Sequence, residues 1–171
     1  MDSDRVFFVT TVTVQRIPIF RRETTTRLLI DTLAHYRDQQ KFLLHEFVIM
    51  PDHIHVLLTP AEEISLERAM QFIQGGFSYR LDTRGSVWQA SFTNHRIRDW
   101  DDYEHHRVNI RMNPVRARLA PRPDAYPNWF IEDGPGPSGV KALWLRRSAN
   151  AVLKRRCSTM ARNSPRAVRI S

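Results

Sequence analysis

Residues 42–60, FLLHEFVIMPDHIHVLLTP, contain two largely apolar stretches on either side of a short polar break. Phe42–Met50 is expected to form a strand, because aromatic, β-branched and other apolar residues dominate it. Pro51 and Asp52 favour a turn, and His53–Leu58 predicts a further strand that ends before Pro60. The stretch therefore predicts an antiparallel hairpin.

The segments on either side of this hairpin show alternating strand and helix patterns. Val6–Gln15 is rich in Val, Phe and Thr, which favours a strand. Apolar residues at helical spacing predict a helix over Glu23–Gln40 and a second helix after Ser65, a residue type that commonly caps helix N-termini. The hairpin is therefore expected to lie between two helices along the chain.

A further strand and helix are expected in the next part of the chain. Val87–Arg98 is expected to be extended, and a third helix is expected over Asp101–Met112, ended by Pro114. The order strand, helix, strand, strand, helix, strand, helix predicts an α+β fold. We expect a ferredoxin-like sandwich, in which an antiparallel sheet carries helices on one face.

The composition changes after residue 127, where prolines and glycines become frequent. We expect one folded domain over residues 1–127, a linker over 128–140, and a basic tail over 141–171 that is partly helical or disordered. The formal charge is +8, with 17 basic and 18 acidic residues in 1–140 and 9 basic and no acidic residues in 141–171. Either the tail screens nucleic-acid phosphates, or it is simply a solvated segment.

The sequence also excludes some classes of protein. It contains no run of about 18 apolar residues, so we expect neither a membrane span nor a membrane partner, and the default expectation is a cytoplasmic protein. Cys157 is the single cysteine, which excludes a disulfide framework or a cysteine zinc cluster within one chain.

Two histidines in the second half of the hairpin have the spacing of a metal site. On a strand, side chains two positions apart lie on the same face, so His53 and His55 project together and Ile54 projects to the other side. The triplet alone is also compatible with two ordinary surface or hydrogen-bonded histidines.

Two asparagines in the third expected helix provide a further candidate. Asn109 and Asn113 are four positions apart and therefore share one helical face. The side-chain oxygen of Asn113 could act as a third metal ligand, although an asparagine at a helix end is also a common cap.

Three segments taken together resemble one known family. MPDHIH at 50–55, WQASFTNHRIR at 88–98 and NPVRA at 113–117 resemble, in order and spacing, the REP-associated tyrosine transposases, which are HUH-class single-tyrosine transposases. The resemblance spans residues 5–127. It implies single-stranded or hairpin DNA as partner, metal-dependent strand cleavage and rejoining, and Mg²⁺ or Mn²⁺ held by His53, His55 and Asn113.

The sequence departs from this family at the nucleophile. The family's catalytic tyrosine corresponds to Asn109, and an amide cannot form a phosphotyrosine link. Tyr103 is the nearest substitute but falls on another helical face, and Tyr79 cannot be placed from sequence. The chain is therefore either an enzyme that uses another nucleophile, such as metal-activated water, or a catalytically inactive DNA-binding remnant or regulator. An RNA-binding module is a third, less favoured alternative.

The resemblance also suggests residues that contact DNA. These are His95, Arg96, Arg98 and Arg116, which are equally compatible with solvated surface positions. Related enzymes include monomers and homodimers, so both states are open.

Overall fold

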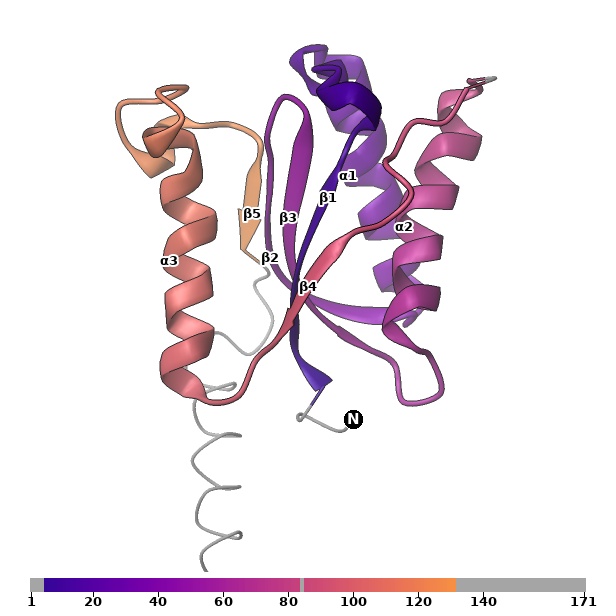
Figure 1. Cartoon of the computed structure of the whole chain (residues 1–171), viewed down its shortest axis with the longest axis vertical. Helices are drawn as coiled ribbons and strands as arrows, with labels where there is room; N and C mark the ends of the chain where they lie inside the picture. The colour runs from indigo at the N-terminus through magenta and orange to yellow at the C-terminus, as the bar shows by residue number, and fades with distance from the viewer. Residues whose placement is uncertain (1–4, 84, 132–171) are drawn as a thin grey trace, which may run out of the picture. The chain divides into compact units, whose positions relative to one another are not determined.

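The computed structural model describes residues 5–83 and 85–131. A five-stranded antiparallel sheet with strand order β4-β1-β3-β2-β5 forms the centre of this part of the chain (Figure 1). The strands are β1 (Phe7–Val12), β2 (Phe42–Ile49), β3 (His53–Pro60), β4 (Thr93–Arg96) and β5 (Trp129–Ile131). The α-helices are α1 (Glu23–Asp38), α2 (Leu66–Leu81) and α3 (Trp100–Arg116), and short 3-10 turns occupy Val14–Arg16, Ile19–Arg21 and Pro123–Ala125.

The expected hairpin is present as β2 and β3. Phe42 pairs with Pro60 and Ile49 with Ile54, but the register shifts between Leu44 and Glu46. This bulge changes which side chains of β2 face each side of the sheet, because strand side chains alternate. As a result Glu46 lies opposite Leu57, on the same face as the histidines of β3.

The helices α1 and α2 cover one face of the sheet and enclose the core between them and the strands (Figure 1). The largest fully buried side chains belong to these layers or to the hairpin turn: Leu29, Leu33, Phe42, Leu44, Ile49, Met50, Ile54, Leu57, Leu58, Met70, Ile73 and Phe77. The apolar spacing that predicted α1 and α2 is therefore the pattern that covers the sheet. Ser65 caps α2, since its side chain accepts a hydrogen bond from the Arg68 backbone N–H.

The expected fold class, an α+β ferredoxin-like sandwich with an antiparallel sheet, is confirmed. Whereas the sequence placed the helices on one face, α3 lies on the opposite face (Figure 1). The reason is electrostatic, because the completely buried carboxylate of Glu46 receives hydrogen bonds from Arg107 at 2.9 Å and from Arg111 at 2.7 Å. A buried carboxylate needs such partners, and both come from α3.

α3 does not end before Pro114 but continues to Arg116. A proline removes one N–H from the helix ladder, which costs little here because only one further turn follows. The last turn is closed by hydrogen bonds from the Ala117 N–H to the Asn113 carbonyl and from the Leu119 N–H to the Pro114 carbonyl. Asn113 therefore lies within the helix.

β5 lies beyond the boundary expected at 127, so the sheet includes residues 129–131. Trp129, Phe130 and Ile131 pair with β2, and the hydroxyl of Tyr126 donates a buried hydrogen bond to the Ile49 carbonyl at 2.8 Å. Residues 132–140 of the expected linker and the expected basic tail lie outside the described residues. Among the described residues, no helix is long and apolar enough to cross a membrane.

Candidate metal centre

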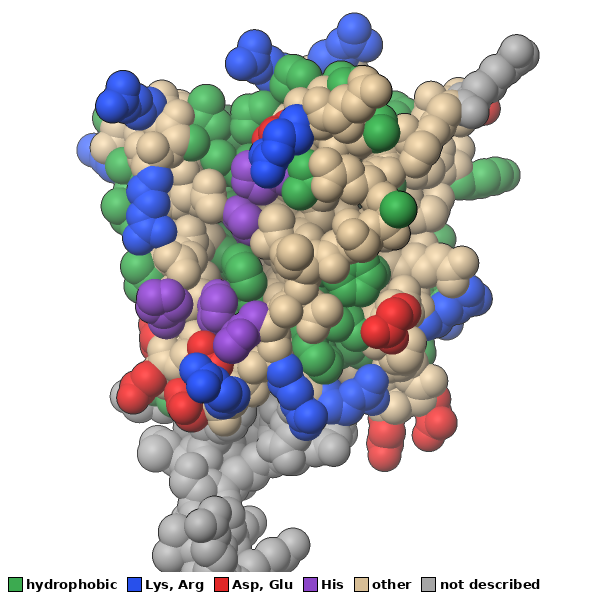
Figure 2. Space-filling model, viewed as in Figure 1, with side chains coloured by type: hydrophobic (Ala, Val, Ile, Leu, Met, Phe, Trp, Pro, Cys, Tyr) green, Lys and Arg blue, Asp and Glu red, His purple; other side chains and the backbone are tan. Residues whose placement is uncertain are grey.

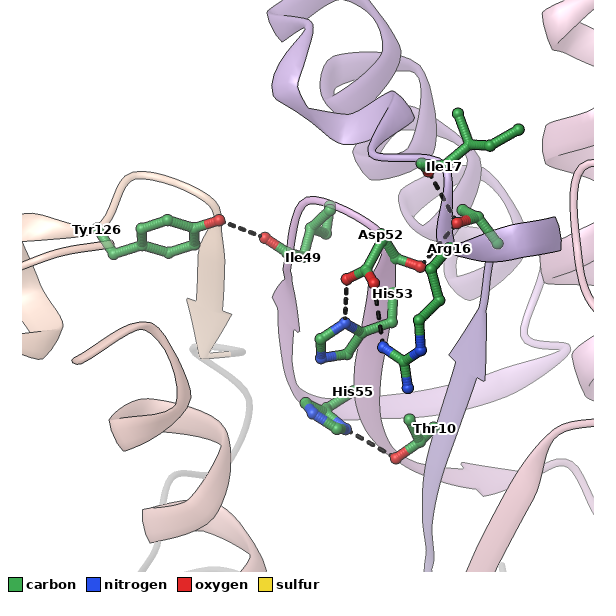
Figure 3. Close-up of polar contacts among 9 residues, drawn as sticks. Thr10, Arg16, Ile17, Ile49, Asp52, His53, His55 and Tyr126 are labelled. Atoms are coloured by element: carbon green, nitrogen blue, oxygen red, sulfur yellow. Dashed lines mark hydrogen bonds and ion pairs between the residues drawn. The ribbon is translucent and has the colours of Figure 1, made fainter. Parts of the chain in front are cut away.

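His53 and His55 lie on β3 with their rings on the same face of the sheet, and their ring centroids are 4.8 Å apart (Figure 3). Each ring is held by a hydrogen bond at Nδ1. For His53 the partner is the Asp52 carboxylate at 2.6 Å, and for His55 it is the Thr10 hydroxyl at 2.7 Å. Among the described residues, neither Nε2 atom makes a hydrogen bond, so both remain available to a ligand.

Asp52 connects this pair to the end of β1 (Figure 3). Its second carboxylate oxygen accepts a hydrogen bond from Arg16 at 3.0 Å, and its backbone carbonyl accepts one from the Thr13 hydroxyl at 2.9 Å. Burial acts to raise the pKa of Asp52, but the hydrogen bonds from His53 and Arg16 outweigh it, and the pKa lies below its ordinary value. Asp52 is therefore an anion that orients His53.

His55 is a neutral imidazole over the physiological range. Burial, and then the neighbouring His53, lowers the pKa of His55 from 6.5 to about 3. On its far side the ring stacks with Phe8 at a centroid distance of 5.4 Å. A neutral imidazole with a fixed ring and a bonded Nδ1 is the state in which histidine binds metal ions.

The direction of α3 determines which of its residues face this pair. Tyr103, near the start of α3, packs edge-on against His45, which is hydrogen-bonded to Thr59 near the end of β3. One turn further along, Arg107 contacts Glu46, which lies closer to the hairpin turn. α3 therefore runs antiparallel to β3, as the ribbon also shows (Figure 1).

This direction brings Asn113 to the level of the histidines. The helical rise from Tyr103 to Asn113 is about 15 Å, and the strand distance from Thr59 to His55 is about 14 Å. Asn113 therefore lies level with His55 along the sheet. Its side chain is partly exposed, and it shares a helical face with His106 and Asn109 because these positions are three and four residues apart.

Asn109 occupies the position where the resemblance expects a tyrosine, and its side chain has a partner on α3. The Arg116 guanidinium donates a hydrogen bond to Asn109 Oδ1 at 2.7 Å. The two candidate substitutes do not fit the role. Tyr103 is 4% exposed and stacks with Trp100, and burial raises its pKa to about 12, whereas Tyr79 is 87% exposed on α2, across the sheet. Neither phenol lies beside the His53–His55 pair.

A second polar cluster lies further along the same face, where β4 meets the start of α3. His95 donates to Asp102 at 2.8 Å, and His106 Nε2 lies 3.5 Å from the same carboxylate. Burial acts to raise the pKa of Asp102, but hydrogen bonds from His95 and Arg98 lower it to about 2. One potential ligand atom each from His95, Asp102 and His106 lies within 4.8 Å of the others, so this part of the structure could also hold a metal ion.

The residues expected to contact DNA lie in three different environments. Arg96 is exposed on β4, and Arg98 is exposed beyond its contact with Asp102. His95 belongs to the second cluster, and Arg116 lies at the end of α3 beside Asn109. The four residues therefore flank both ends of α3 rather than forming one patch.

Comparison with known proteins relates this arrangement to a family. A family model described as IS200-like transposase matches residues 6–99, more than half of the chain. The chain belongs to the IS200-like transposase family. His53, His55 and His95 lie inside the matched range, whereas α3, with Asn109 and Asn113, begins just beyond it.

One curated relative is similar to part of this chain. The REP-associated tyrosine transposase of Escherichia coli (strain K12) is 27% identical over 94 residues, which are 54% of this chain and 56% of that protein. The match thus spans little more than half the length of the curated relative. The resemblance inferred from the three motifs is confirmed by this relative and by the family model.

A solved structure of a REP-associated tyrosine transposase bound to a REP hairpin is similar in fold. Its TM-score is 0.66, with 23% identity over 74% of this chain and 76% of that chain. At this identity, the match shows that this chain and that structure share a fold.

Sequence reasoning missed the residues that support the ligands. Asp52 was interpreted as a turn residue, and Thr10 and Asp102 were given no role beyond lying in an expected strand and at the start of an expected helix. Adjacency to His53 could have indicated Asp52, but Thr10 reaches His55 only through the β1–β3 register. Asp99 caps α3, and its side chain accepts a hydrogen bond from the Asp102 N–H at 2.9 Å.

Proposed function

We propose that this chain binds DNA hairpins along the face between α3 and β3, with a divalent cation held by His53, His55 and Asn113. The observation that carries the proposal is the pair of Nδ1 hydrogen bonds, to Asp52 and to Thr10. These bonds fix both rings and leave both Nε2 atoms for a ligand. Two histidines that were merely structural would not need to present the same ring atom on the same face.

The donor set fits a divalent ion. The two Nε2 atoms supply nitrogen ligands, and the Asn113 side chain supplies an oxygen at the level of His55. We propose Mg²⁺ or Mn²⁺ because the three motifs resemble enzymes that use these ions. When bound, such an ion would polarise a phosphate oxygen and offset the negative charge that gathers there.

The DNA part of the proposal rests on relatives and on charge. A structural relative is bound to a REP hairpin. In this chain exposed arginines lie near both ends of the face: Arg16 beside Asp52, Arg96 and Arg98 around β4, and Arg116 at the end of α3. Guanidinium groups bind phosphates through paired hydrogen bonds, which suits contacts to a DNA backbone.

We further propose that binding occurs without a phosphotyrosine intermediate. The side chain of Asn109 has no group that can attack phosphorus and form a covalent link to the DNA strand. Its amide oxygen accepts a hydrogen bond from Arg116. Tyr103 is buried and Tyr79 lies across the sheet, so neither supplies the missing phenol. The chain would bind the hairpin and leave it uncut.

The test uses a hairpin oligonucleotide carrying a 5′ label, with Mn²⁺ or with chelator. The native chain should retard the labelled hairpin in Mn²⁺ and give neither an adduct nor a shortened strand on denaturing gels. Asn109→Tyr should restore some covalent adduct. The double variant Asn109→Tyr, Tyr103→Phe should give the same adduct, which assigns it to position 109.

Three outcomes would overturn parts of this proposal. An adduct formed by the native chain would place the nucleophile elsewhere, and a shortened strand without adduct would replace simple binding by hydrolysis. If His53→Ala binds Mn²⁺ as tightly as the native chain does, the metal centre is not at this pair. His35→Ala, on the exposed surface of α1, is the matched control for losing one imidazole.

A further inference from the structure

A second group of histidines lies on the same face of the molecule as the first, as Figure 2 shows. This group includes His95 on β4 and His106 on α3, with Asp102 one turn before His106. The proposed function does not use His106 or Asp102. The arrangement of these three side chains has several features that a simple hydrogen-bond cluster leaves unexplained.

The first feature is the spacing of the donor atoms. His95 Nε2 lies 2.8 Å and 3.1 Å from the two oxygens of Asp102, and His106 Nε2 lies 3.5 Å from one of them. Metal–ligand bonds of about 2.0–2.2 Å place donors around one zinc ion about 3–3.6 Å apart. The distances from the two imidazoles to Asp102 are therefore close to the spacing of ligands around one ion, and the three donor atoms all lie within 4.8 Å of one another.

The second feature is that one carboxylate is shared by two imidazoles. Asp102 is well bonded to His95, but a nitrogen–oxygen distance of 3.5 Å to His106 is too long for a good hydrogen bond. Nδ1 of His106 is buried and has no hydrogen-bond partner among the described residues. Among the described residues, neither ring nitrogen of His106 therefore makes a good hydrogen bond.

The third feature is the support around the cluster. Phe8 stacks on His106 at a centroid distance of 4.4 Å, and the His95 and His106 rings are 4.7 Å apart. The Arg98 backbone N–H donates to Asp102 at 3.0 Å and its Nε at 3.3 Å. Supporting contacts of this kind orient metal ligands before the ion arrives.

We propose that His95, Asp102 and His106 form a second metal site, which binds a zinc-class transition ion and joins the edge strand β4 to α3. Two imidazoles and one carboxylate favour zinc, cobalt or nickel over magnesium, which prefers oxygen ligands. Three protein ligands leave at least one position open to water or to an anion. Among the described strands, β4 pairs only with β1, so an ion here would add a cross-link between this edge of the sheet and the helix.

The test counts zinc and cobalt ions on the untagged full chain carrying Cys157→Ser, which removes the thiol as a ligand. In the background His53→Ala, His55→Ala, we expect one zinc ion per chain by calorimetry and an absorption spectrum of bound Co²⁺. Adding His106→Gln should weaken zinc binding at least tenfold. His105→Gln, the exposed neighbour on α3, should leave it unchanged.

Thermal unfolding gives an independent readout. In the same background, added zinc should raise Tm progressively with its concentration, and His106→Gln or His95→Gln should abolish that shift. Binding of no zinc ion by the background chain, or an unchanged affinity after His106→Gln, would overturn the second site. Either result leaves the His53–His55 centre untouched, since that pair is absent from every chain compared.

Discussion

The Nδ1 atom of His55 lies 2.7 Å from the hydroxyl oxygen of Thr10, which is its cross-strand partner in the β1–β3 pairing. The imidazole of His55 is neutral and its Nδ1 is occupied, so its Nε2 is the atom presented to the face under α3. The ring orientation of one proposed ligand is therefore set by a residue 45 positions earlier in the chain.

Replacing Thr10 tests this relationship. Thr10→Val keeps the shape of the side chain but removes the hydroxyl, so the His55 ring loses its support. We expect Mn²⁺ affinity, measured by calorimetry, to fall about 10–100-fold. Thr93→Val is the matched control, because Thr93 pairs with Thr10 on β4 and is exposed. Equal losses in the two variants would show that the hydroxyl of Thr10 has no special role.

Removing the charge of Glu46 should destabilise the docking of α3. Glu46→Gln removes the buried counter-ion of Arg107, whose side chain is 8% exposed and then keeps only the partly exposed Glu104, and breaking a buried pair in this way costs about 3–5 kcal/mol. Denaturant unfolding measures the loss. Arg122→Gln breaks the exposed Arg122–Asp124 pair and should cost less than about 1 kcal/mol. Similar losses from both changes would contradict the role given to burial.

The two adjacent glycines of α2 should respond in opposite directions to alanine. A Cβ on Gly76 would overlap the Tyr36 ring of α1, whereas one on Gly75 would have its nearest neighbour at 4.0 Å. Gly75→Ala should stabilise the helix by about 0.5–1 kcal/mol. Gly76→Ala should destabilise the chain by about 1–3 kcal/mol. Thermal unfolding of the pair checks the prediction, and stabilisation by both would refute the close packing of α1 on α2.

Stability should fall as the pH drops below about 6.5, partly through His45. Burial, and then the charge of Arg107, lowers the pKa of His45 from 6.5 to about 4. The unfolded chain therefore binds a proton between these pH values that the folded chain does not. Each such proton makes the unfolding free energy rise with pH by up to about 1.4 kcal/mol per unit.

The variant His45→Gln isolates this contribution. Glutamine does not titrate, and its amide can keep the contact with the Thr59 hydroxyl. The dependence of the unfolding free energy on pH, measured by denaturant titration between pH 4.5 and 6.5, should become shallower. His55, whose pKa is about 3, will keep part of the slope. An unchanged slope would mean that His45 is protonated in the folded state.

The hairpin and the helices were predictable because their patterns are local. Alternation and helical spacing identified β2, β3, α1 and α2, and the same-face rule placed His53 and His55 together. The side of the sheet on which α3 lies was not predictable. It depends on the bulge that turns Glu46 to the other face, and a one-residue register shift leaves no pattern in the sequence.

The candidate site was predictable only in part, for a related reason. The histidines are two residues apart, but their supports Thr10 and Asp52 and the cluster around Asp102 come together through pairing and packing. Asp102 looks like any acidic residue in a first helical turn until β4 brings His95 to it. The sequence did not predict that α3 continues past Pro114, because proline usually ends a helix. The proline is tolerated here because the helix ends at Arg116, within one turn of it.

β3 lies at the centre of the sheet, with β1 and β2 on either side, whereas position 109 lies on a helix laid over that sheet. The proposed metal ligands on β3 and the position of the reacting side chain on α3 thus belong to elements that tolerate substitution differently. A single substitution at the nucleophile position of the helix can abolish strand cleavage while the ligand-binding residues of the strand are retained. Under the proposed function, a chain altered in this way would compete with a cleaving relative for the same DNA hairpins.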